Sequence, residues 1–245
     1  MTLARTLATA RRVLQQLRHD PRTIALLILL PTVLMALLAW LLADRPDDFY
    51  QYGAPILGIF PLLVMFLVTS VATLRERTSG TMERLLAMPL GKGDFIFGYA
   101  IAFSIAAILQ AVVVTGVSVG LLGLDVRGPL WALLLVAVLQ GLLGTSLGLL
   151  CSAFARTEFQ AVQFMPAVLM PQLLVCGLII PRDDMPRALE LVSNVLPMTY
   201  AVDATQQILM STTVTTDFWR DIVVLVGFIV AGLLVASATL RRTTD

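Results

Sequence analysis

Charged residues are scarce in this chain of 245 residues: Asp, Glu, Lys and Arg make up 13% of it, whereas 58% is hydrophobic. An ordinary soluble domain carries about 25% charged residues. The shortage of charge therefore excludes an ordinary soluble domain and predicts a membrane protein.

Residues that build metal sites and disulfides are also few. His19 is the one histidine and falls in a predicted turn, so a surface position is favoured over a metal ligand, and no metal site is expected. Cys151 and Cys176 both fall inside predicted membrane spans, which favours a packing role over a disulfide.

Charge is absent from the middle of the long apolar runs, where no Asp, Glu, Lys or Arg occurs. Intramembrane charges are the usual mark of proton relays, so their absence argues against a proton- or sodium-driven pump. The paired carboxylates or metal cluster of an intramembrane enzyme are missing as well. A phosphate-binding G-x-x-x-x-G-K-[ST] motif is also lacking, because "GKGDF" at Gly91 has neither the preceding glycine nor the strand context. Any ATP chemistry must therefore come from another polypeptide.

Long apolar runs are what the sequence has in abundance. A helix crosses a hydrocarbon core of roughly 30 Å with about 20 residues, and six runs reach that length. Their continuous apolar character favours helices over the alternating strands of a barrel. The predicted fold class is an all-α polytopic membrane protein, a single transmembrane domain over residues 1–245. Its six predicted spans are 24–43, 53–74, 95–122, 129–154, 159–180 and 222–240.

Basic residues are unevenly distributed between the spans. Twelve fall on the side that holds both termini and five on the other. The positive-inside rule therefore places both termini in the cytoplasm of a multi-pass protein of the cell (inner or plasma) membrane. The twelve are Arg5, Arg11, Arg12, Arg18, Arg22, Arg75, Arg77, Arg84, Lys92, Arg156, Arg241 and Arg242; the five are Arg45, Arg127, Arg182, Arg187 and Arg220.

Residues 1–22 form a predicted amphipathic helix, in which apolar residues recur at helical spacing and arginines occupy the rest of the surface. We expect it to lie on the cytoplasmic membrane face with its arginines toward lipid headgroups. A solvated helix leading into the first span is the alternative. The apolar positions are Leu3, Leu7, Ala10, Leu14 and Leu17.

Two kinds of residue inside the spans could join helices. Each glutamine at depth must find a hydrogen-bond partner or line a hydrated path, and we favour bonds between helices over contact with a transported molecule. Glycine pairs four residues apart allow close helix approach, within one chain or between two. The glutamines are Gln110, Gln140, Gln163 and Gln172; the glycine pairs are Gly116/Gly120 and Gly144/Gly148.

Residues 181–221 form the one long segment on the predicted outer side. The segment mixes prolines with apolar residues at helical spacing. We expect a helix or re-entrant hairpin at the outer interface, closing the outer end of a pathway. The candidate outer-gate residues are Pro186, Leu189, Pro197 and Tyr200.

The polar segment 75–94 separates the second and third spans. Ser79 and Gly80 mark a turn, and Thr81 can cap a helix. Glu83 lies in the first turn, where a carboxylate interacts favourably with the helix dipole, and Pro89 ends the helix about two turns later. An exposed, partly apolar helix of this kind suggests a docking surface for another protein, with packing on the membrane surface as the alternative. Its apolar positions are Met82, Leu85, Leu86 and Met88.

Four stretches together resemble the type-2 ATP-binding-cassette (ABC) exporter permeases, the transmembrane subunits of drug-resistance and lipid export. "ERTSGTMERLLAMPL" resembles that family's cytoplasmic loop, which has a charged-GT-x-E-x-L-x-x-x-P pattern. "GLIIPRDDMPRALELVSNVLPMTYAVDATQQIL" looks like its region before the last span, and "RHDPRT" and "FARTEFQAVQF" are similar to other family positions. The chain departs at Ala188 and Leu189, where an aromatic is frequent, and at Gln206 or Gln207, where a basic residue is.

The resemblance implies a six-span half of an exporter in which Thr81–Met88 is a coupling helix. In this family that helix rests in a groove of an ATP-binding subunit and transmits its closing to the spans. The implied partners are two ATP-binding subunits, which hold ATP and Mg, and a second permease chain, identical or paralogous, in a lipid membrane. This chain is then neither an enzyme nor the holder of a cofactor, and no nucleic acid is involved. The predicted partner-coupling residues are Gly80, Thr81, Met82, Glu83, Arg84, Leu85, Leu86 and Pro89.

The substrate is constrained only by polarity. Apolar spans without buried charge favour an amphipathic drug, lipid or glycolipid over small ions. A non-transporting sensor or scaffold that docks the same ATP-binding subunit is the alternative function.

Overall fold

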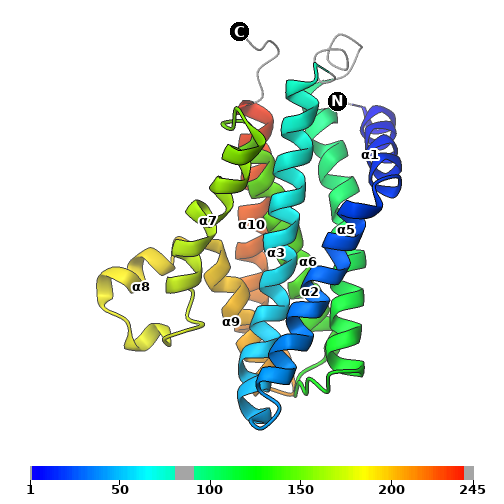
Figure 1. Cartoon of the computed structure of the whole chain (residues 1–245). Helices are drawn as coiled ribbons and strands as arrows, with labels where there is room; N and C mark the ends of the chain where they lie inside the picture. Colours follow the sequence, from blue (N-terminus) through cyan, green and yellow to red (C-terminus); the bar gives the residue numbers. More distant parts are fainter. Residues whose placement is uncertain (1, 81–90, 240–245) are drawn as a thin grey trace.

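The computed structural model describes residues 2–80 and 91–239, and every regular element in these ranges is helical (Figure 1). This confirms the predicted all-α class. The elements in chain order are α1 (Leu3–Arg18), α2 (Pro21–Leu41), α3 (Pro46–Thr78), α5 (Lys92–Gly120), α6 (Leu130–Ser152), α7 (Glu158–Val175), the short 3-10 helix η1 (Arg182–Asp184), α8 (Arg187–Ser193), α9 (Pro197–Met210) and α10 (Thr216–Thr239).

Five helices of the described chain are long and apolar enough to cross a membrane: α2, α3, α5 from Gly93 onward, α6 and α10. They correspond to five of the six predicted spans. The helix α3 has 33 residues and extends beyond the predicted 53–74 in both directions. It begins early because Pro46 fits the first helical turn, where no backbone N–H is needed.

The remaining predicted span, 159–180, differs from the structure. The helix α7 ends at Val175, and its 18 residues cover about 27 Å, less than a full crossing. It stops there because Gly177 adopts φ 90°, a left-handed conformation that ends a helix and that glycine tolerates best. After the turn and α8, the 14 residues of α9 continue the path toward the opposite end of the bundle (Figure 1).

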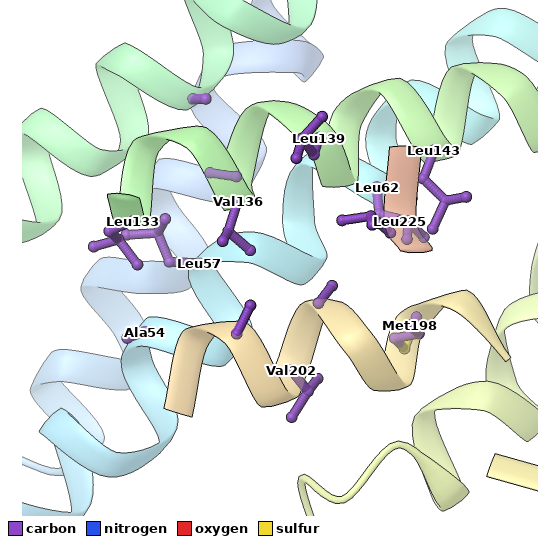
Figure 2. Packing of buried hydrophobic residues seen from close by; sticks show 14 of the residues in the cluster. Ala54, Leu57, Leu62, Leu133, Val136, Leu139, Leu143, Met198, Val202 and Leu225 are labelled. Carbon is purple, nitrogen blue, oxygen red and sulfur yellow. The ribbon is translucent and has the colours of Figure 1, made fainter. Parts of the chain in front are cut away.

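The helix α9 was predicted as part of an interfacial outer segment, but it is buried in the bundle. Met198, Ala201 and Val202 are fully buried, and α9 packs against α3, α6 and α10. Figure 2 shows α9 beside α3 and α6, with apolar residues of all three in one cluster. In Figure 1, η1 and α8 project from the bundle whereas α9 runs within it, so a helix lying on the surface does not describe the second half of 181–221, and the re-entrant hairpin stays a prediction.

The helices α3 and α6 form the most extensive pair in the described chain. A side chain at Gly144 would overlap the Leu62 carbonyl group, and one at Gly148 would overlap that of Phe66. This predicted glycine pair therefore joins helices within one chain. A side chain at Gly116 or Gly120 would meet no described atom within 4 Å, so that pair makes no such contact here.

The helix α1 packs against α5, where Gly98 allows Thr9 to approach closely. The predicted apolar face is split, because Ala10 is buried while Leu3 and Leu7 are 75% and 49% exposed. The helix is therefore part of the bundle, and only its exposed leucines remain for the predicted lipid contact. The buried residues of α1 are Thr6, Thr9, Ala10 and Val13.

The start of α1, the end of α3, the start of α5 and the end of α10 all lie at one end of the bundle (Figure 1). We name this the loop end, because α3 stops there at Thr78 and α5 begins there at Lys92. Its assignment to the cytoplasm stays a prediction from the arginine distribution.

Candidate functional site

The predicted partner-coupling residues fall on both sides of the boundary of the described chain. Gly80 is described and has φ 70°, which ends α3 and confirms the predicted turn. The others lie outside the described residues, so their helix stays a prediction. These are Thr81, Met82, Glu83, Arg84, Leu85, Leu86 and Pro89.

Two arginines fix the end of α3, from which the segment 81–90 departs. Arg75 donates two hydrogen bonds to the Glu158 carboxylate of α7, from Nε to Oε1 at 2.8 Å and from Nη2 to Oε2 at 3.0 Å. Arg77 donates to the backbone carbonyl of Ser152 at the end of α6. The hydrogen bonds from Arg75 hold the pKa of Glu158 below its ordinary value. The end of α3 is therefore tied to both α6 and α7.

Asp94 fixes the start of α5, to which the segment returns. Its Oδ1 accepts hydrogen bonds from the Thr2 backbone N–H at 2.9 Å and the Thr6 hydroxyl at 3.1 Å. Its Oδ2 accepts from the Gly91 backbone N–H at 3.0 Å. Asp94 is 1% exposed, so both oxygens depend on these donors. The start of α5 is thus joined to the start of α1.

A third group of polar side chains joins α1, α3 and α5. Arg12 Nη1 donates to Glu76 Oε1 at 2.9 Å, and Gln16 Nε2 donates to the same oxygen at 3.2 Å. Arg12 Nη2 donates to the Tyr99 hydroxyl at 3.1 Å. Glu76 is only 8% exposed, so this ion pair is largely shielded from water.

These three groups form what we name the loop-end network: Arg75 with Glu158 and Arg77 with Ser152, the Asp94 cluster, and the Arg12, Gln16, Glu76 and Tyr99 cluster. It connects α1, α3, α5, α6 and α7 beside the end of α3 and the start of α5. Charge-assisted hydrogen bonds are short and directional. The end of α3 and the start of α5 are therefore each bonded to other helices of the bundle.

A cavity of about 890 Å³ adjoins the loop-end network and is lined by residues of α1, α2, α3, α5 and α7. Its volume falls in the range of roughly 300–1,000 Å³ that is typical of small-molecule sites. Glu76 and Glu158 of the network line it. The network thus lies where a bound molecule could contact it.

The four predicted glutamines are not brought together. Gln110 and Gln140 are fully buried, and neither amide has a hydrogen-bond partner among residues 2–80 and 91–239. Gln172 donates to Val168 in its own helix, and Gln163 is exposed. The predicted bonds between helices are therefore not made within the described chain, and none of the four lines the cavity.

The four outer-gate residues divide into two pairs. Pro186 and Leu189 are exposed at the start of α8 and within it. Pro197 is buried as the first residue of α9, and the Tyr200 hydroxyl donates to the Asn194 carbonyl at 2.7 Å. The first pair therefore faces outward, and the second holds α8 to α9. Their role as a gate stays a prediction.

Arg182 adds a polar anchor to the same region. Its guanidinium donates to the Asp203 carboxylate and to the Asn194 side chain. The turn that carries η1 is thereby attached to α9, which is itself packed in the bundle.

Sequence reasoning did not single out Glu76, Tyr99 or Asp94 as site residues. Arg12 and Glu76 are 64 positions apart, and Thr2 and Asp94 are 92 apart, so no local pattern joins them. The sequence did contain one signal. Glu76 lies two residues after the apolar run that ends at Leu74, so it is an acidic residue at the edge of a predicted span.

Comparisons with known proteins find similarity to the membrane permeases of ABC transporters. The family model described as ABC-2 type transporter matches residues 5–210. The probable multidrug ABC transporter permease YbhR of Escherichia coli (strain K12) is 27% identical over 176 residues, which cover 71% of this chain and 48% of that protein. The probable multidrug ABC transporter permease YbhS of the same strain is 30% identical over 146 residues, covering 59% and 39%.

A further relative is the nodulation protein J of Rhizobium leguminosarum bv. viciae, 26% identical over 172 residues, which cover 69% of this chain and 64% of that protein. The chain spans about half the length of YbhR in the match, and less of YbhS.

Proposed function

The chain belongs to the ABC-2 type transporter family, and from this we propose that it is the membrane-spanning permease subunit of an ATP-driven exporter. ATP and Mg are held by a separate ATP-binding subunit, which docks on the helix within residues 81–90. Two such subunits act with two permease chains, identical or paralogous. The loop end faces the cytoplasm, and the substrate leaves toward the other side.

The loop-end network is the observation that carries this proposal. A subunit docked on the predicted coupling helix acts on the chain between Gly80 and Gly91, and on both sides of that segment charged side chains reach other helices. Arg75 and Arg77 tie one side to α7 and α6, and Asp94 ties the other to α1. Closing of the ATP-binding subunits would thus reach several helices at once, as coupling requires.

The substrate class is an amphipathic molecule: a drug, lipid or glycolipid. The cavity beside the network, whose wall is mainly apolar, supports this, as do the names of two relatives, YbhR and YbhS, which are probable multidrug permeases. A sensor or scaffold that docks the same subunit without transport is the alternative, and it predicts docking without substrate movement.

Substitution of Glu83 by Lys tests the proposal. It reverses a charge in the first turn of the predicted coupling helix, where a carboxylate contributes about 0.3–1 kcal/mol and is available for a basic partner group. The matched control is Glu190→Lys, because Glu190 also lies in the first turn of a short helix, α8, away from the loop end.

Glu83→Lys should insert normally but lose recovery of the ATP-binding subunit in affinity purification, or lose substrate-stimulated ATPase activity. Glu190→Lys should keep subunit recovery. Normal recovery, stimulation and export in Glu83→Lys would contradict docking at this helix. Normal docking with no ATP-dependent export of any amphipathic substrate in the wild type would favour the sensor.

A further inference from the structure

All three tryptophans of the chain lie toward the end of the bundle opposite the loop end. Trp131 is the second residue of α6 and Trp219 the fourth of α10, and both helices end at the loop end (Figure 1). Trp40 is the last residue but one of α2, which leads into the start of α3. Tryptophan is enriched where a bilayer meets water, because its ring is apolar and its N–H is polar. The distribution therefore indicates a membrane interface at this end.

Trp131 and Trp219 form a stacked pair, although they are far apart in sequence. Their ring centroids are 6.1 Å apart, and the ring planes meet at 28°. Phe218, which is 1% exposed, contacts both rings edge-on, at 6.4 Å from Trp131 and 5.6 Å from Trp219. Trp131 and Trp219 nevertheless remain 50% and 49% exposed. The core thus holds the two rings in place while much of their surface stays open to a partner.

The pair also lies at the depth expected of an interface. From Trp131 to Ser152 in α6, and from Trp219 to Thr239 in α10, the chain runs about 20 residues, which rise roughly 30 Å along a helix. The hydrocarbon core of a bilayer has about this thickness. Two separate helices therefore give the same boundary, with the tryptophans at one surface and the loop end at the other.

The exposed face of α10 continues from Trp219 toward the loop end as an apolar stripe. Its residues recur at helical spacing, so they lie on one side of the helix. Such a stripe suits the acyl chain of a lipid that lies along the helix. The stripe consists of the exposed residues Trp219, Val223, Val226, Val230 and Leu234.

Arg220 places a positive charge beside the pair. It follows Trp219, is exposed, and makes no ion pair with any residue of 2–80 or 91–239. An arginine near the end of a span reaches the interface with its long side chain and binds phosphate through paired N–H donors. Asp217, one turn earlier, is exposed as well, which suits the ammonium group of a zwitterionic headgroup. Asp221 is instead largely buried and accepts a hydrogen bond from Gln207.

We propose that Trp131, Trp219 and Arg220 bind one glycerophospholipid of the leaflet opposite the loop end. Its phosphate pairs with Arg220, its glycerol ester region rests against the two indole rings, and one acyl chain follows the α10 stripe. The site goes beyond the proposed function, because it needs neither an ATP-binding subunit nor a transported molecule. The bound lipid fixes the depth of α6 and α10 in the membrane.

Brominated lipids test the depth, because bromine on an acyl chain quenches tryptophan fluorescence on contact. The full chain with Trp40→Phe keeps only the stacked pair as its tryptophans. It is placed in nanodiscs of phosphatidylcholine brominated either near the headgroup or near the end of the chain. The lipid brominated near the headgroup should quench more strongly. Stronger quenching by the other lipid would overturn the position of the boundary. Quenching by neither would show that water or a helix of another chain covers the pair, which overturns the lipid site.

Recognition of the phosphate is tested in non-ionic detergent. The Trp40→Phe protein is titrated with the phosphatidylcholine brominated near the headgroup, and with a diacylglycerol that has the same chains but no phosphate. The phospholipid should reach half-maximal quenching at a mole fraction about threefold lower. Arg220→Gln should remove this preference. The control Arg45→Gln should keep it, because Arg45 is an exposed arginine before α3 at the same end of the bundle.

Equal half-maximal mole fractions for the two lipids in the Trp40→Phe protein would overturn the phosphate contact. A preference that survives Arg220→Gln would overturn the role of Arg220. An equal loss of preference in Arg45→Gln would reduce the effect to general surface charge and overturn a defined site.

Discussion

Polar side chains join distant parts of the chain at the loop end, whereas in the α8–α9 region they join near neighbours. Gln16 and Glu76 are 60 positions apart and Thr2 and Asp94 are 92 apart, but Arg182 reaches Asp203 across only 21. The first arrangement joins several helices of the bundle to one another. The second attaches η1 and α8 to α9, which is itself packed in the bundle.

The two regions also differ in what they expose. On α8, Leu191 is 60% exposed and Val192 51%, and Val195 after it is 68% exposed. At the loop end the network residues Glu76 and Asp94 are nearly fully buried. The loop end is thus stabilised by contacts within the chain, whereas α8 exposes apolar side chains that no described residue covers.

The largest effect is expected from Asp94→Ala. It leaves three donors without their acceptor at a buried position and should cost roughly 2–3 kcal/mol. Thermal unfolding in detergent measures it, with Asp47→Ala as the control, because Asp47 is an exposed carboxylate in the first turn of α3. Equal unfolding temperatures in the two variants would mean that the link between α1 and α5 contributes little.

Charges on α8 should reduce transport without disturbing docking. Leu189→Asp or Val192→Asp places a carboxylate on an apolar surface, and we expect ATP-dependent export to fall by on the order of tenfold while recovery of the ATP-binding subunit is unchanged. Uptake into inverted vesicles measures this, with the exposed Thr212→Asp as control. Full export in both α8 variants would contradict the proposal that α8 is part of an outer gate.

Reversal of the pair between Arg75 and Glu158 should affect coupling more than stability. The pair is exposed, so Arg75→Glu should cost less than about 1 kcal/mol. The ratio of export to ATP hydrolysis should nevertheless fall, because α3 loses its tie to α7. The double variant Arg75→Glu with Glu158→Arg restores the attraction and should restore the ratio. If the double variant stays as uncoupled as the single one, the ion pair itself does not transmit motion.

The smallest effect concerns pH. The pKa of Glu158 is lowered in the folded protein by hydrogen bonds from Arg75, so its stabilising contribution is complete above the ordinary glutamate pKa and is lost as the pH falls through the lowered value. The stability difference between wild type and Glu158→Gln should therefore begin to shrink as the pH falls below the ordinary glutamate pKa of about 4.3, and should vanish below the lowered pKa. A difference that is the same at neutral and acidic pH would show that it does not come from the charge.

Much of the fold could be predicted from the sequence because a long apolar helix leaves a continuous signal. The spans in α2, α3, α5, α6 and α10 were found in this way. The predicted span 159–180 was not found as one long helix, because α7 ends at Val175, just before the left-handed turn at Gly177. Sequence periodicity alone does not tell a short buried helix such as α9 from one on the membrane surface.

The candidate site was predictable only where its signals are local. The turn at Gly80 follows from residue types, and it is confirmed. The network around Glu76 and Asp94 depends on contacts between helices far apart in sequence, which no spacing rule predicts. Likewise, the cavity exists only once α1, α2, α3, α5 and α7 are packed together.

The most direct test of the central claim is photo-crosslinking from the segment between α3 and α5. A photoreactive amino acid is placed at Leu85 in the predicted coupling helix, with Leu191 on α8 as the control, and the crosslinked protein is identified by mass spectrometry. We predict that Leu85 captures a protein with a G-x-x-x-x-G-K-[ST] motif and that Leu191 does not. Crosslinking of Leu85 to lipid alone, or equal capture of such a protein from Leu191, would contradict docking of an ATP-binding subunit at this segment.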